Sequence, residues 1–137
     1  AADISAVSLQ TNQQGQAIAD TCESVTVYYS GADAQLATSG YEYFRFHLAD
    51  FPIRLGSIGP FYAYPAPLAL NPNVIGVDSS SVTVAPAVSN ILNIHPSYRF
   101  IPEILKDLTE TMLGAAQSNR SPIPGPTQGF VLKGQPW

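Results

Sequence analysis

The sequence predicts an α+β fold in which an antiparallel β-sheet is followed by a C-terminal helix. Up to about residue 100, short apolar segments rich in β-branched and aromatic residues alternate with proline, glycine, asparagine and serine. This pattern is typical of strands joined by turns. Beyond residue 102 the apolar residues recur at three- and four-residue spacing, which is the period of an amphipathic helix. The change of period divides the chain into a sheet region and a helical region.

One domain covers the whole predicted fold. The chain has 137 residues and a hydrophobic content of 45%, which suffices for a single core. We expect strands over about 1–100, a helix over about 102–117 and an extended tail over 118–137.

The strands are predicted with unequal clarity. Residues 4–9 alternate weakly and suggest a short strand, whereas residues 25–29 (Val-Thr-Val-Tyr-Tyr) form a strand that ends at a Ser-Gly turn. Residues 41–48 give the clearest alternation in the chain. Several shorter apolar segments follow, each bounded by turn residues: 53–55, 60–64, 74–77, 82–85 and 88–95.

The strand at residues 41–48 carries the arrangement that most specifically indicates a function. One face is apolar, and the other presents Tyr41, Tyr43, Arg45 and His47. Aromatic rings can stack on unpaired bases, while arginine and histidine contact phosphates or base edges. These four residues are therefore candidates for RNA binding. The alternative is that the tyrosines cover a two-sided sheet and Arg45 pairs with an acid.

The predicted helix has one apolar stripe. Pro102 suits its first turn, and Gly114 or Asn119 suits its end. The helix could cover its own sheet, or it could lie across the sheet of a second subunit in an interlocked dimer. The Pro-rich linker at residues 122–126 and the apolar tail after it favour the second arrangement. The predicted subunit interface comprises apolar residues of the helix and tail: Ile104, Leu105, Leu108, Met112, Phe130 and Trp137.

Charge is scarce along the chain, and this also indicates subunit contacts. Charged residues make up 12% of the sequence, against about 25% in an average globular protein. Between residues 55 and 98 the one formal charge is Asp78. Prolines and glycines in this stretch exclude a regular membrane-spanning helix, so we expect no membrane partner. Neighbouring subunits are expected to cover much of it.

Catalytic and metal-binding patterns are absent from the sequence. The two histidines and the single cysteine, Cys22, form no cluster with metal-ligand spacing, and no Gly-x-Ser-x-Gly motif is present. The net charge of −4 does not indicate nonspecific binding to nucleic acid through a basic surface. We therefore expect neither an enzyme nor a cofactor or metal.

From about residue 88 onward, the order of features resembles the coat proteins of single-stranded RNA bacteriophages (levivirus-like). The resemblance rests on a strand at residues 89–94, an amphipathic helix at 103–116 and a Ser-Pro-Ile-Pro turn at 121–124 before a short tail that ends in an aromatic residue. It implies a capsid subunit, made in the bacterial cytoplasm, whose interlocked dimers assemble into an icosahedral shell. It also implies that the inner sheet surface binds a hairpin of the viral RNA.

Two other functions remain open at this point. The chain could be a decoration or head–tail connection protein of a tailed phage, which binds a separate capsid lattice. It could also be a small-molecule binding module whose pocket is lined by Phe61, Tyr62 and Tyr64.

Overall fold

A computed structural model of the chain describes residues 6–31, 56, 59–60, 71–83, 101–125 and 128–134. The described elements are, in chain order, η1 (Ala6–Leu9), α1 (Gln16–Thr21), β1 (Val25–Tyr29), β2 (Val74–Asp78), α4 (Ser80–Thr83), α6 (Pro102–Met112), β3 (Arg120–Pro122) and β4 (Gly129–Leu132). Helices and strands are both present, so the α+β character expected from the sequence is confirmed.

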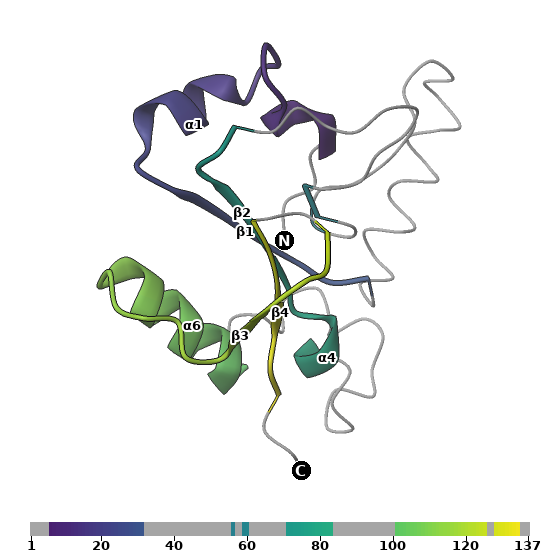
Figure 1. The fold of residues 1–137 in the computed structure, drawn as a ribbon, viewed down its shortest axis with the longest axis vertical. Coiled ribbons are helices and arrows are strands. Elements are labelled where there is room, and N and C mark those ends of the chain that lie inside the picture. Colours follow the sequence, from purple (N-terminus) through teal and green to yellow (C-terminus); the bar gives the residue numbers. More distant parts are fainter. Residues whose placement is uncertain are drawn as a thin grey trace.

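The described strands form one sheet with the order β1-β2-β4-β3 (Figure 1). Strand β1 pairs with β2 in parallel, β2 pairs with β4 in parallel, and β3 pairs with β4 antiparallel. The predicted antiparallel sheet is therefore wrong for two of these three pairings. Parallel neighbours require long connections between strands, and residues 30–73 and 79–128 supply them.

The two faces of the sheet cover separate hydrophobic clusters. On one face, Val27 of β1 and Val74 of β2 pack with Leu9 and with Ala19 of α1. On the other face, Val77 and Leu132 pack with Ile101, with Ile104 of α6 and with Val82 of α4, and the partly buried Tyr28 and Ile75 adjoin them. Since side chains alternate along a strand, neighbouring residues such as Val27 and Tyr28 serve different clusters. Figure 1 shows α1 near the end at which β1 and β2 begin, and α6 alongside β3 and β4.

Helix α6 begins where the sequence predicts but ends about five residues earlier than expected. Pro102 occupies the first helical turn, where its missing N–H costs no hydrogen bond, and Glu103 favours the positive end of the helix dipole. Gly114 has a φ of 65°, which ends the helix after Met112 and Leu113. The predicted helix extended to about residue 117.

The C-terminal segment folds back onto its own chain. Residues 118–137 were expected to form an extended tail that reaches a neighbouring subunit. Instead, β3 and β4 form a hairpin in which Arg120 pairs with Leu132 and Pro122 pairs with Phe130. The Leu132 side chain is fully buried in the chain's own core. The Pro-rich linker gives no signal for this hairpin. Strand β4 is held in place by pairing with β2, which is distant in the sequence.

Other predicted elements have mixed outcomes. The strands at residues 25–29 and 74–77 are confirmed as β1 and β2. The short strand expected at 4–9 is wrong, since Ala6–Leu9 is a 3-10 helix, and Val82 lies in α4 rather than in a strand. Helix α1 was not predicted. Three further predicted strands, at residues 41–48, 53–55 and 88–95 (the last includes the strand at 89–94), lie outside the described residues, as does most of the one at 60–64.

Candidate subunit interface

Helix α6 places a polar face against the sheet and an apolar face toward solvent. Glu103 and Asp107 are buried together with Ile104, and Asp107 has no exposed surface at all. The apolar stripe that the sequence places toward a core is therefore divided. Ile101 and Ile104 enter the chain's own core, whereas the rest of the stripe does not.

The outward face consists of Leu105, Leu108, Met112 and Leu113, whose exposed fractions lie between 40% and 79%. Leu105, Leu108 and Met112 are three and four residues apart, so they share one side of the helix. We call these four residues the α6 apolar face. Exposed apolar side chains gathered in this way are typical of surfaces that bind another protein.

A buried network of hydrogen bonds holds the polar side of α6 on the sheet. The Asp107 carboxylate accepts hydrogen bonds from Tyr28 Oη at 2.6 Å, from Arg120 Nε at 2.8 Å and from Arg120 Nη2 at 2.8 Å. Arg120 Nη2 also donates to Thr111 Oγ1 at 2.7 Å, and Thr111 Oγ1 donates to the Asp107 carbonyl oxygen at 2.8 Å. We call Tyr28, Asp107, Thr111 and Arg120 the Asp107 cluster. Its members come from β1, α6 and β3, so it joins three elements.

The electrostatics of the Asp107 cluster favour its present protonation states. Burial, with the hydrogen bond and negative charge of Asp107, raises the pKa of Tyr28 to about 12. Burial alone would lower the pKa of Arg120, but the hydrogen bond and charge of Asp107 outweigh it, so that pKa lies above its ordinary value. The phenol therefore stays protonated and the guanidinium stays charged at neutral pH.

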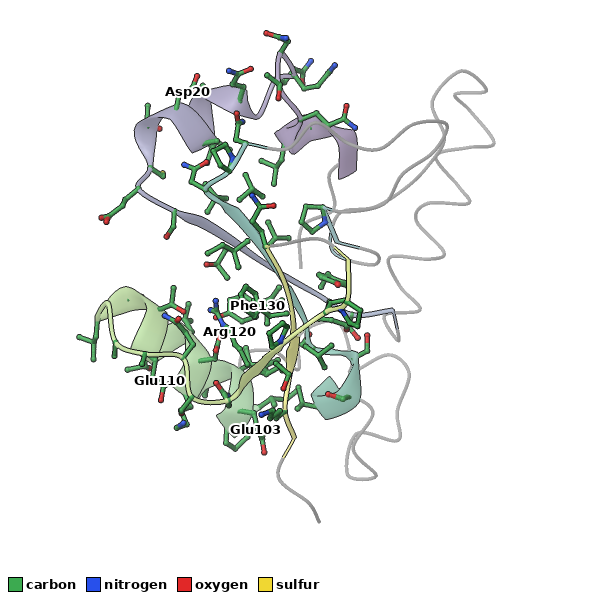
Figure 2. All side chains as sticks on the ribbon, in the orientation of Figure 1. Asp20, Glu103, Glu110, Arg120 and Phe130 are labelled. Atoms are coloured by element: carbon green, nitrogen blue, oxygen red, sulfur yellow. The ribbon has the colours of Figure 1, made fainter. Side chains whose placement is uncertain are left out.

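The position of Arg120 is fixed from the sheet side. Its backbone pairs with Leu132 across the β3–β4 hairpin, and its guanidinium lies over the Phe130 ring at 5.9 Å from the ring centroid. Figure 2 shows the Arg120 side chain between α6 and the strands, close to Phe130. Asn119, next to it, donates to the Glu103 carbonyl oxygen at 3.1 Å. The segment after α6 is thus attached to both ends of the helix's buried side.

The exposed charges of α6 neutralise each other. Lys106 Nζ lies 2.9 Å from Glu110 Oε1, one helical turn away, and donates to Ser118 Oγ at 2.6 Å. The hydrogen bond from Lys106 lowers the pKa of Glu110. Figure 2 shows Glu110 on the outer flank of the helix. The α6 apolar face itself contains no charged residue.

The structure separates the predicted interface residues. Leu105, Leu108 and Met112 lie together on the exposed side of α6, whereas Ile104 is buried in the chain's own core. Phe130 lies in β4, where it is partly buried beneath Arg120. Trp137 lies outside the described residues.

The predicted RNA-binding residues Tyr41, Tyr43, Arg45 and His47 lie outside the described residues. So do Phe61, Tyr62 and Tyr64, which the alternative binding pocket requires.

Sequence reasoning missed the Asp107 cluster and Leu113. The apolar spacing of the helix does not by itself indicate that Asp107 lies on the buried side. One signal could have located it: Asp107 lies three residues from Ile104 and four from Thr111, so all three share one side of the helix. No sequence pattern identifies Tyr28 and Arg120 as its partners, because they lie 79 and 13 residues away from Asp107 along the chain.

Within the described ranges, no group of three or more histidine, cysteine, aspartate or glutamate residues could hold a metal ion. In that same part of the chain, no helix has the length and hydropathy needed to cross a bilayer. No protein-family model, curated protein or solved structure matches the chain.

Proposed function

We propose that this chain is a structural subunit that associates with copies of itself through the α6 apolar face. The observation that carries the proposal is the outward position of Leu105, Leu108, Met112 and Leu113 on a helix whose other side is firmly attached to the sheet. Water-exposed side chains of this kind reduce solubility unless a partner covers them.

A second copy of the chain is the occupant that fits this face. The face carries no charge, and the nearby Lys106 and Glu110 neutralise each other, so two copies meet without like-charge repulsion. In a two-fold contact the same patch serves both subunits, and an apolar patch is complementary to itself.

The size of the face indicates the kind of assembly. Four side chains expose a few hundred Å² of apolar surface, whereas a stable dimer of standard size buries about 800 Å² on each partner. The α6 contact alone is therefore weak. Many such contacts, repeated in a closed assembly, hold together because each one raises the effective concentration for the next.

A virion shell is the form of assembly that the sequence resemblance favours. The low content of charged residues, 12%, and the nearly uncharged stretch at 55–98 agree with extensive subunit contacts. The parallel pairing of β1, β2 and β4 differs from the sheet that the resemblance implies, so the proposal rests on the exposed helix face rather than on the likeness to coat proteins.

Self-association is tested by sedimentation velocity and electron microscopy of the purified chain. We expect concentration-dependent dimers or larger discrete particles. Leu108→Lys and Met112→Lys each place a charge in the contact and should yield monomers. Ile18→Lys is the matched control, because Ile18 is an exposed apolar residue of α1, which packs on the other face of the sheet. A monomer at high concentration, or equal association of all variants, contradicts the proposal.

RNA binding is a separate part of the virion proposal and needs its own test. Arg45→Ala should weaken binding to a pool of short RNA hairpins and make the remaining affinity less dependent on salt, while self-association persists. Unchanged affinity would remove Arg45 from an RNA site. Assembly only on an added phage capsid lattice would favour a decoration protein instead.

A further inference from the structure

Two sides of helix α6 could compete for the same place on the sheet. The side now buried presents Glu103, Asp107 and Thr111, and the exposed side presents Leu105, Leu108 and Met112. Ile101 and Ile104 adjoin both sides and remain near the sheet in either orientation. Successive residues of an α-helix are about 100° apart around its axis, so one roll of that size exchanges Asp107 for Leu108.

Hydrophobic burial alone favours the opposite orientation to the one observed. Turning the leucines inward would remove apolar surface from water, and turning Asp107 outward would restore its hydration. A specific interaction must therefore hold the polar side against the sheet.

The Asp107 cluster has the geometry to do this. Arg120 donates one hydrogen bond to each Asp107 carboxylate oxygen, both at 2.8 Å. This bidentate contact requires a defined orientation of the planar guanidinium relative to the planar carboxylate. Tyr28 fixes the carboxylate from β1 at 2.6 Å, and Thr111 extends the contact by one helical turn. Rolling the helix breaks all of these bonds together and leaves the Arg120 guanidinium, whose side chain is 5% exposed, without its carboxylate.

We propose that the Asp107 cluster sets the rotation of α6 and thereby keeps the α6 apolar face available to a partner. The role of the face in binding a partner rests on the proposed function. The orientation of the helix does not depend on it. The cluster lies on the opposite side of the helix from any partner, so it acts by positioning.

The test measures which side of α6 meets solvent. Leu108→Cys in a Cys22→Ser background supplies one thiol on the apolar face, and its rate of reaction with a small disulfide reagent is measured at a dilution where the chain is monomeric. The thiol should react as an exposed group. Adding Asp107→Leu and Arg120→Met removes both charges without leaving one buried alone, so the helix is free to roll. The rate should then fall about tenfold or more.

Matched controls make the outcome decisive. Ile18→Cys, on the other face of the sheet, should react at the same rate with and without the two cluster substitutions, which excludes a general loosening. Equal reactivity of the residue-108 thiol in both backgrounds, with cooperative unfolding retained, overturns the inference. Should the double substitution abolish folding, Arg120→Lys decides instead, because it keeps the charge but loses the paired contact. Protection of the residue-108 thiol in that variant supports the inference, and unchanged reactivity overturns it.

The two proposals can fail separately. A chain that stays monomeric at every concentration but gains protection at residue 108 refutes the proposed function and retains the inference. A chain that associates but shows no change in protection refutes the inference alone.

Discussion

Among the described residues, helix α6 carries two ion pairs that differ chiefly in their surroundings. The Asp107–Arg120 pair has an N···O distance of 2.8 Å, and its side chains are 0% and 5% exposed. The Lys106–Glu110 pair has nearly the same distance, 2.9 Å, but its side chains are 55% and 19% exposed. The two charge–charge interactions therefore differ in strength despite their similar distances, because water screens the second pair and is excluded from the first.

The difference shows what each pair does for the fold. An exposed pair between flexible side chains adds little stability, since each partner is well hydrated when the pair is broken. A buried pair has already lost its hydration, so breaking one half leaves a charge that nothing compensates. Its main effect is on specificity: the Asp107–Arg120 pair determines which side of α6 faces the sheet, whereas the Lys106–Glu110 pair is compatible with many arrangements.

The largest effect is expected from Arg120→Ala. The substitution leaves Asp107 buried with only the Tyr28 phenol donating to its carboxylate among the contacts described above, and should lower the free energy of unfolding by about 3–5 kcal/mol. Urea unfolding followed by circular dichroism measures the change. Lys133→Ala, at an exposed position at the end of β4, is the control and should leave stability nearly unchanged. A loss no larger than that of the control would mean that Asp107 is hydrated and that the two ion pairs of α6 do not differ.

The sequence predicted the local parts of this fold and missed the distant pairings. Residues 25–29 were identified as a strand from five β-branched and aromatic residues in succession, and Pro102 and Gly114 marked the helix because both act through their own backbone angles. The direction in which β1 meets β2 depends on contacts between residues 25 and 74, and nothing in either segment encodes it.

The candidate interface was predicted as a set of residues but not as an orientation. Leu105, Leu108 and Met112 were expected to be buried by a second subunit, and the spacing placed them correctly on one side of the helix. That the chain's own sheet leaves them uncovered depends on Asp107, whose partners come from β1 and β3. Periodicity alone assigns the most apolar side to the nearest core, and a buried ion pair overrides that assignment.

A smaller effect is expected from Tyr28→Phe, which removes one of the three hydrogen bonds that described residues donate to the Asp107 carboxylate. Its signature is a change in pH dependence. The pKa of Tyr28 is raised from 10.0 to about 12, so between these values the unfolded chain loses the phenolic proton and the folded chain retains it. The stabilisation is therefore complete below pH 10 and is lost as the pH rises toward 12. In Tyr28→Phe the urea midpoint should fall less steeply over this range.

Tyr29→Phe is the matched control for that measurement. Burial raises the pKa of Tyr29 to about 12 as well, with Asp78 adding to the shift, but Tyr29 lies on the opposite face of the sheet from the Asp107 cluster. Both variants should flatten the alkaline loss of stability, and Tyr28→Phe alone should also weaken the attachment of α6 at neutral pH. Equal stability of the two variants at neutral pH would show that the Tyr28 hydrogen bond contributes nothing to holding the helix.

The smallest effect is expected from Lys106→Ala, which breaks the exposed pair as Arg120→Ala breaks the buried one. Glu110 regains water as a partner and keeps its hydrogen bonds from Ser118, so the urea midpoint should stay within experimental error of the parent chain. The pKa of Glu110, lowered chiefly by the hydrogen bond from Lys106, should rise toward its ordinary value in an NMR titration. A titration shift without a change in stability is what a solvent-screened pair predicts. If Lys106→Ala instead destabilised the chain as much as Arg120→Ala, burial would not be what distinguishes the two pairs, and the orientation of α6 would need another cause.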